Sequence, residues 1–343
     1  MVCPRSEADD LGELPGALDW FARRPRLAAL LGAACISFSG IFYRYADVSP
    51  STGTVYRALF GLPLLILVGY AEHRRHGGLP ASTVRLAAIA GLFFAGDLLL
   101  WHHAIEAVGA GLATVLGNLQ VIVVGIVAWL LLGERPSRST ILALPVVLAG
   151  VVLISGVLGA DAYGADPALG VILGIATALC YAGYLLVIRR GLRDPGRPAG
   201  PVAVATVFVA IAGSAVGFVG GDLDPTPPLA SLGWLAVLGV TSQSAGYLLI
   251  SISLPRLPAL ITSIILLAQP VMTVLLSMAL LAEAPSLTQL VGVALVIGGI
   301  AAATVPVARI RDSFASARLG PAVGPIGRPG DPFGRAKNDP NDP

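Results

Sequence analysis

The sequence predicts an all-α integral membrane protein in which ten transmembrane helices form two five-helix repeats of opposite orientation. Three observations support this fold class. Hydrophobic residues make up 55% of the chain and charged residues only 12%. The apolar residues fall into ten stretches of membrane-spanning length, and a segment near the middle of the chain recurs near its end.

The composition excludes an ordinary soluble domain, in which about 25% of the residues are charged. The formal net charge of +2 comes almost entirely from arginine, since Lys337 is the only lysine. The arginines cluster between apolar stretches, as expected for membrane topology and not for nucleic-acid binding. Cys3, Cys35 and Cys180 are far apart and belong to no CxxC motif, so we expect no disulfide and no zinc site.

Each apolar stretch is long enough to cross the bilayer, because a helix of roughly 20 residues spans a hydrocarbon core of about 30 Å. We expect a cytoplasmic N-terminal segment at 1–26, a first repeat at 27–157, a second repeat at 167–307, and a disordered cytoplasmic tail at 308–343. The predicted spans are 27–46, 51–71, 84–107, 110–132, 138–157, 167–189, 200–220, 231–254, 258–281 and 286–307.

The distribution of arginine predicts the orientation of the chain. Alternate loops carry either arginines or acidic residues, and the arginine-bearing loops are expected to stay in the cytoplasm. Both termini are therefore predicted to be cytoplasmic, in a multi-pass protein of the plasma or inner membrane. The first set includes Arg23, Arg24, Arg26, Arg74, Arg75, Arg135, Arg189, Arg190 and Arg256, and the second includes Asp47, Glu106, Asp222 and Glu283.

A segment in the first half of the chain has a counterpart 149 residues later: LQVIVVGIVAWLLLGERPS at 119–137 matches AQPVMTVLLSMALLAEAPS at 268–286. Glu134 is predicted at the cytoplasmic face and Glu283 at the opposite face, so the two halves would cross the membrane in opposite directions. Inverted repeats build many secondary transporters, whose substrate site lies between the halves. The match pairs Gln120 with Gln269, Glu134 with Glu283, Pro136 with Pro285 and Gly150 with Gly299.

With these features the chain resembles the EamA family of the drug/metabolite transporter superfamily over about residues 27–307. The resemblance implies ten helices, cytoplasmic termini and export or uptake of metabolites without ATP hydrolysis. Of the two directions, we expect export, although the sequence leaves the direction open. The family often has proline at the position of Pro270 in the second half, and the equivalent position in the first half is Val121. A proline kink is therefore in question in the first half. The matching features are Ser49, Pro50 and Arg57, VGAGLATVL at 108–116, and the GERPS and AEAPS endings.

Ionisable residues inside the predicted spans are the first functional candidates, because a charge in lipid costs several kcal/mol unless it meets protein, water or a partner. At 1.5 Å per residue, Asp97 lies roughly 15 Å and Arg57 roughly 9 Å from the same membrane face. An Arg57–Asp97 pair is therefore possible if their helices are neighbours. Two interpretations stay open: an ion pair that only stabilises the packing, or a coupling site for a proton or another cation at Asp97.

Aromatic and histidine side chains follow Asp97 on the same helix. Trp101 comes four residues later and shares its face, as either a wall of the substrate cavity or an anchor at the membrane interface. His102 and His103 could relay protons, but neighbouring residues of a helix point in different directions, so at most one should face the cavity. No third ligand accompanies them, and we expect no metal site.

Amide and phenol groups complete the predicted cavity. Gln120 lies on a small-residue face, and Gln269 occupies the related position in the second half. Both amides would either line the cavity or form hydrogen bonds between helices. Glu134 and Glu283 are expected to have structural roles at helix ends. The candidates from the second half are Tyr181, Tyr184, Gln243 and Tyr247.

These features predict a secondary transporter that moves a small molecule across the lipid bilayer by alternating access. No GxxxxGK[ST] motif is present, so a gradient should supply the energy. No nucleophile-and-base motif is present either, and we expect neither enzymatic activity nor a cofactor. A channel or a non-transporting sensor is the alternative function. Substrate, coupling ion and oligomeric state stay open, although one intramembrane carboxylate beside Trp and Gln would suit a neutral, zwitterionic or aromatic solute.

Overall fold

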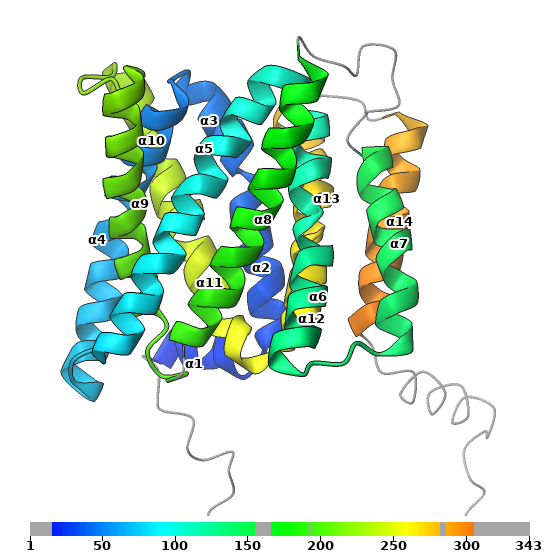
Figure 1. Ribbon diagram of the computed structural model, residues 1–343, viewed down its shortest axis with the longest axis horizontal. Helices are drawn as coiled ribbons and strands as arrows, with labels where there is room; N and C mark the ends of the chain where they lie inside the picture. Colours follow the sequence, from blue (N-terminus) through cyan, green and yellow to red (C-terminus); the bar gives the residue numbers. More distant parts are fainter. Residues whose placement is uncertain (1–15, 155–165, 193, 282–285, 305–343) are drawn as a thin grey trace, which may run out of the picture. The chain divides into compact units, whose positions relative to one another are not determined.

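The structure of this protein is a computed structural model, which describes residues 16–154, 166–192, 194–281 and 286–304 (Figure 1). All regular secondary structure in these residues is helical, which confirms the predicted all-α class. The first half contains α1 (Gly16–Ala22), α2 (Pro25–Ser37), α3 (Ser39–Ala46), α4 (Pro50–His76), α5 (Ala81–Asn118), α6 (Gln120–Leu132) and α7 (Arg138–Ile154). The second half contains α8 (Pro167–Gly191), α9 (Ala199–Gly220), α10 (Leu229–Leu238), the π-helix η1 (Gly239–Gly246), α11 (Tyr247–Ser253), the 3₁₀ helix η2 (Leu254–Arg256), α12 (Ala259–Leu266), α13 (Ala268–Leu281) and α14 (Leu287–Thr304).

Helices of membrane-spanning length account for six of the predicted spans within the described residues, and they confirm a multi-pass membrane protein. The other four predicted spans correspond to shorter apolar helices of 10–17 residues, so the total of ten crossings stays a prediction. The six are Pro25–Ala46, Pro50–His76, Ala81–Ala107, Ala168–Gly191, Ala199–Gly220 and Leu229–Arg256. The shorter four are Leu116–Leu132, Arg138–Leu153, Ala259–Met272 and Leu290–Ala303.

Local sequence explains where several of these helices begin and end. The Ser49 hydroxyl accepts a hydrogen bond from the backbone N–H of Thr52 (3.3 Å), and Pro50 occupies the first position of α4; both features favour a helix start. Gly133 follows α6 with a φ of 68°, a left-handed conformation that glycine adopts without strain. Ser49 and Pro50 therefore mark the start of α4, and Gly133, the glycine of GERPS, marks the end of α6.

Helix α5 reverses direction before it ends. Its helical residues run without a break from Ala81 to Asn118, and in a straight helix Trp101 and Gly117 would lie about 24 Å apart. Instead, a Cβ atom on Gly117 would lie 4.0 Å from Cδ1 of Trp101. The chain therefore turns back between these two residues, where the sequence predicts the boundary between the spans 84–107 and 110–132.

Helices α7 and α14 occupy equivalent places in the two repeats and pack side by side (Figure 1). A Cβ atom on Gly150 of α7 would lie 2.8 Å from Cγ2 of Val296 on α14, and one on Gly299 of α14 would clash with Cγ2 of Val147 on α7. Gly299 follows Gly150, and Val296 follows Val147, by the same 149 residues. This reciprocal contact relates the two helices by a pseudo-twofold axis, as expected for an inverted repeat.

Helices α4 and α9 form a second antiparallel pair, which we call the α4–α9 seam, and carboxylates hold it at both ends. The two carboxylate oxygens of Glu72 accept hydrogen bonds from the backbone N–H groups of Ala199 and Gly200, both at 2.9 Å. At the other end, Oδ2 of Asp222 accepts a hydrogen bond from the N–H of Ser51 at 3.2 Å. Ser51 and Gly200 are 149 residues apart, and Glu72 and Asp222 are 150 residues apart. The two contacts are therefore counterparts under the repeat.

Several predicted spans are interrupted helices, a feature that the sequence analysis does not predict. The break between α5 and α6 at Leu119 and the break between α12 and α13 at Leu267 are 148 residues apart, so they fall at nearly equivalent places in the repeats. Only the second break has a proline nearby, Pro270, whereas the first has Val121. The interruption therefore does not depend on proline. The other interruptions are at Phe38, between α2 and α3, and over the π-helix Gly239–Gly246.

Candidate functional site

Two side chains of opposite charge are buried inside the bundle without a hydrogen bond or a direct ion pair. Arg57 of α4 is 2% exposed and Asp97 of α5 is 9% exposed. Within the described part of the chain, neither side chain takes part in an ion pair or a hydrogen bond, and Nε of Arg57 is enclosed with no acceptor. The ion pair that the sequence allows is therefore not closed in this structure. Both charges are therefore candidates for a functional role.

An aromatic cluster from three helices lies beside Asp97. Phe94 precedes Asp97 by one turn of α5 and shares its face. The ring centroid of Phe94 lies 4.6 Å from that of Tyr184 on α8 and 4.5 Å from that of Tyr247 on α11, and Tyr181 stacks on Tyr184 at 6.1 Å. We call these four residues the aromatic cluster. Such rings offer a surface for a planar or apolar group next to the charge.

The π-helix η1 brings Gln243 against the part of α4 that carries Arg57. Glycines allow this approach: a Cβ atom on Gly239 would lie 2.7 Å from the backbone oxygen of Arg57, and one on Gly61 would lie 2.8 Å from Cγ of Gln243. Nε2 of Gln243 donates a hydrogen bond to Oγ1 of Thr206 on α9 at 3.1 Å. The amide oxygen of Gln243 is enclosed with no donor among the described residues, so it adds an unused acceptor near Arg57.

The residues that follow Asp97 on α5 do not all face the charged centre. His102 is 3% exposed and stacks on Tyr43 with ring centroids 4.0 Å apart, whereas His103 is exposed and lies 3.4 Å from Glu106. Nδ1 of His102 has no partner in the described residues. Trp101 is half-buried and faces Gly117 across the reversal of α5. The histidine that lies inside the bundle is therefore His102, and Trp101 contacts the returning arm of α5.

The two glutamines of the repeat bond to other helices. Oε1 of Gln120 accepts a hydrogen bond from Oγ of Ser263 on α12 at 2.7 Å, and both side chains are buried. The backbone oxygen of Gln269 accepts a hydrogen bond from Oγ of Ser37 on α2 at 3.0 Å. For Gln120 the structure therefore shows the helix-joining contact, and the cavity-lining role of Gln120 and Gln269 stays a prediction.

Glu134, at the end of α6, binds charged and backbone groups of the second repeat. Its Oε1 lies 2.6 Å from Nη1 of Arg189 on α8, and its Oε2 accepts a hydrogen bond from the N–H of Ala259 at the start of α12, at 2.7 Å. Arg189 also donates to the backbone oxygens of Leu254 and Leu257 at 2.9 and 3.0 Å. The structural role predicted for Glu134 is thus a bond between repeats. Its counterpart Glu283 lies outside the described residues.

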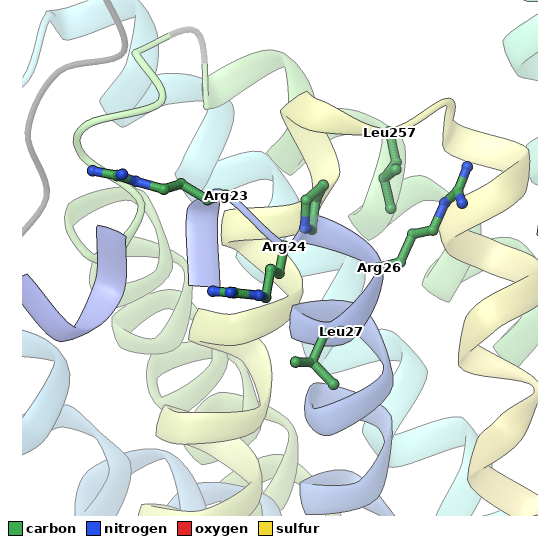
Figure 2. A pocket seen from close by; sticks show the side chains of 6 residues that line it. Arg23, Arg24, Arg26, Leu27 and Leu257 are labelled. Atoms are coloured by element: carbon green, nitrogen blue, oxygen red, sulfur yellow. The ribbon is translucent and has the colours of Figure 1, made fainter. Parts of the chain in front are cut away.

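A surface cavity of about 490 Å³ lies away from this centre, at the start of α2. Figure 2 shows Arg23 and Arg24 extending to one side of that start and Arg26 to the other. The guanidinium of Arg24 lies over the ring of Trp20, 4.3 Å from its centroid. The described residues contain no group of three or more His, Cys, Asp or Glu side chains that could hold a metal ion.

Phe94 and Glu72 are the described residues that sequence reasoning missed most clearly. Phe94 could have been found, because it stands one turn before Asp97 on the same face. Glu72 falls one residue beyond the predicted span 51–71, so its sequence position suggests a loop, although it is 1% exposed. Only the neighbouring helix α9 shows what this carboxylate does.

Comparisons with known proteins agree with this architecture. The family model described as the EamA-like transporter family matches residues 24–156 and 168–305, one match in each half of the chain. A solved structure titled "Crystal structure of protein" is similar in fold, with a TM-score of 0.70, 22% sequence identity, and coverage of 82% of this chain and 98% of that chain. The comparison with curated proteins finds no match. Two copies of the family model cover most of the sequence, and this chain therefore belongs to the EamA-like transporter family.

Proposed function

We propose that this protein is a gradient-driven exporter that moves a small solute across the membrane by alternating access, and that the solute binds between Arg57, Asp97 and the aromatic cluster. Family membership supports transport. The observation that supports the binding site is the burial of two opposite charges that form neither a hydrogen bond nor a direct ion pair with any described residue. A channel or a sensor, the alternative functions, has no comparable observation in its favour.

The physical argument starts from the cost of burial. A charge removed from water loses several kcal/mol of solvation unless hydrogen bonds or a counter-ion replace it. The fold supplies two hydrogen-bond donors to Glu72, whereas Arg57 and Asp97 attract each other only at longer range, without a hydrogen bond or a direct ion pair among the described residues. A bound solute with one anionic and one cationic or hydrogen-bonding group would supply both. Such a solute is neutral or zwitterionic overall, and the aromatic cluster favours a planar or apolar portion.

The origin of the site residues supports alternating access. Arg57 and Asp97 come from the first repeat, whereas Tyr181, Tyr184 and Tyr247 come from the second. Movement of helices of one repeat against helices of the other would therefore change the surroundings of a bound solute and expose it to either face in turn. Both termini are proposed to be cytoplasmic, and Asp97 is the proposed coupling residue if a proton or another cation drives transport.

The test uses purified protein in liposomes and a pooled set of neutral, zwitterionic and cationic metabolites. Uptake is followed by mass spectrometry with and without an imposed pH gradient. We expect one or a few neutral or zwitterionic solutes to accumulate with wild-type protein only when the gradient is present. Arg57→Gln and Asp97→Asn should each abolish this accumulation, because each removes one of the unpartnered charges.

Asp47→Asn is the matched control, because it makes the same chemical change at an exposed residue. It should transport like the wild type. Fast equilibration without accumulation in any gradient would identify a channel instead. Full activity of Asp97→Asn would place the coupling step elsewhere, and accumulation of polycations alone would refute the proposed class of solute.

A further inference from the structure

Glu134 and Arg189 connect the two repeats at one membrane face, the arginine-rich face, where Arg190 and Arg256 also lie. We propose that Glu134, Arg189 and the backbone groups of Leu254, Leu257 and Ala259 form a latch that closes this face of the transport path and breaks in every cycle. This inference rests on the proposed alternating access and adds the residues that control it.

The latch joins elements that must separate for this face to open. Glu134 belongs to the first repeat, whereas Arg189 and the three backbone groups belong to the second. Through these contacts the latch ties the ends of α6, α8, η2 and α12 together. An opening at this face between α6 and the helices α8 and α12 would pull Glu134 away from both Arg189 and Ala259. The ion pair therefore lies between helices that have to separate when an inverted-repeat transporter opens at this face.

Exposure explains why the latch can break while the α4–α9 seam stays joined. The side chains of Glu134 and Arg189 are 24% and 17% exposed, so water can solvate both charges when the pair separates. Glu72 also joins the repeats at this face but is 1% exposed, and separating its carboxylate from α9 would leave it buried without a donor. Breaking the latch is therefore the less costly change.

The two seams also differ in how they are packed. In the α4–α9 seam, Gly213 packs on Thr54 (3.2 Å from an added Cβ), and carboxylates clamp both ends. Helix α6 begins at the mid-span interruption at Leu119, and helix α12 ends at the one at Leu267; the latch joins these two helices. Their described contacts include the hydrogen bond between Gln120 and Ser263. We therefore assign the α4–α9 seam to the part that stays joined, and the α6–α12 seam to the part that opens.

The test measures access to the α6–α12 seam and needs no substrate. Ser263 lies one turn after Ala259 on α12 and is fully buried, so a Ser263→Cys reporter should react only when the seam opens. A membrane-impermeant maleimide is applied to right-side-out and to inside-out vesicles, and the labelling rate is measured. The natural cysteines Cys3, Cys35 and Cys180 are first replaced by serine.

Glu134→Gln should raise the labelling rate of Ser263→Cys roughly tenfold, from the latch side only, as expected for the loss of one charge-assisted contact. Arg189→Lys should raise it less, because lysine keeps the charge but cannot match the fork of bonds that arginine makes to carboxylate and carbonyl groups. Arg190→Gln is the matched control: it removes the neighbouring, exposed arginine and should leave the rate within about twofold of the parent.

A Thr54→Cys reporter in the α4–α9 seam should stay unreactive in all of these variants. Unchanged labelling of Ser263→Cys in both Glu134→Gln and Arg189→Gln would overturn the latch. Equal increases at both reporters would overturn it too, because they would mean that the whole bundle loosens. The liposome assay separates this result from the proposed function. If the Ser263→Cys reporter is labelled faster in the latch variants but the wild type transports no solute, the transport function is refuted alone. If the wild type transports a solute but the latch variants leave the labelling unchanged, the latch is refuted alone.

Discussion

The carboxylate of Glu72, buried at one end of the α4–α9 seam, differs from the charges buried inside the bundle in whether hydrogen bonds offset its burial. Glu72 is 1% exposed, and both of its carboxylate oxygens accept backbone N–H groups at the start of α9. Arg57 and Asp97 are buried to a similar degree, yet no side-chain hydrogen bond or ion pair within the described residues involves either. The cost of desolvation is offset in one region and not in the other.

This difference separates structural charges from functional ones. A buried carboxylate whose oxygens are both satisfied stabilises the helices that it joins, and its removal should weaken the fold. A buried charge without a protein partner contributes no such bond, and its removal should affect what the protein binds. Glu134 and Arg189 lie between these cases, because they are partnered but partly exposed to solvent. Variants at each type of position test this ranking.

Glu72→Gln should have the largest effect, because it removes a buried acceptor from the start of α9. The amide keeps one oxygen but turns an NH₂ group toward a backbone donor, so one N–H group loses its partner. We expect the free energy of unfolding to fall by about 3 kcal/mol, measured by denaturant or thermal unfolding in detergent. Glu106→Gln, at an exposed residue, should change it by less than about 0.5 kcal/mol. A loss below about 1 kcal/mol for Glu72→Gln would contradict the structural role.

Asp97→Asn should affect transport and leave the free energy of unfolding largely unchanged. We expect the initial rate of transport to fall about 100-fold, equivalent to about 2.7 kcal/mol, because the solute or coupling ion loses its counter-charge. The free energy of unfolding should stay the same or rise slightly, since an unpartnered buried charge is removed. Rate and unfolding are measured on the same preparation. A drop in stability of more than about 2 kcal/mol with normal transport would make Asp97 a structural residue.

Gly150→Val and Gly299→Val test the pseudo-twofold contact between α7 and α14. Each added side chain would meet the opposite helix, so each should lower the free energy of unfolding by about 2 kcal/mol, and by similar amounts. Gly298→Val is the matched control, because a Cβ atom there meets nothing within 4 Å. If Gly298→Val destabilises the protein as much as Gly299→Val, the effect comes from the loss of glycine and not from the reciprocal contact.

A double-mutant cycle on Glu134 and Arg189 should show the smallest stability effect. Their side chains are 24% and 17% exposed, so we expect Glu134→Gln and Arg189→Gln to be coupled by about 1 kcal/mol in unfolding experiments. Glu72→Gln and Arg189→Gln share no contact and should be additive. A coupling of about 3 kcal/mol between Glu134 and Arg189 would mean that the latch is too stable to break in each cycle.

The candidate site was predictable where single residues differ from their sequence neighbours. Asp97 and Arg57 stand out because ionisable residues are rare in apolar stretches. The reciprocal contacts of Gly150 and Gly299 between α7 and α14 follow from the repeat that the sequence shows. The role of Glu72 was not predictable, because its partners Ala199 and Gly200 are more than 120 residues away. Their proximity depends on which helices become neighbours.

Composition, the length of the apolar stretches and the repeated motifs are local properties, and they suffice to show an all-helical membrane protein with repeated halves that belongs with the EamA-like transporters. The packing of the helices settles that Arg57 and Asp97 form no direct ion pair, that Gln120 accepts a hydrogen bond from Ser263, and that Glu134 pairs with Arg189. A side chain in a spanning helix can face lipid, a neighbouring helix or a solute path. Only the packing of distant helices selects among these surroundings.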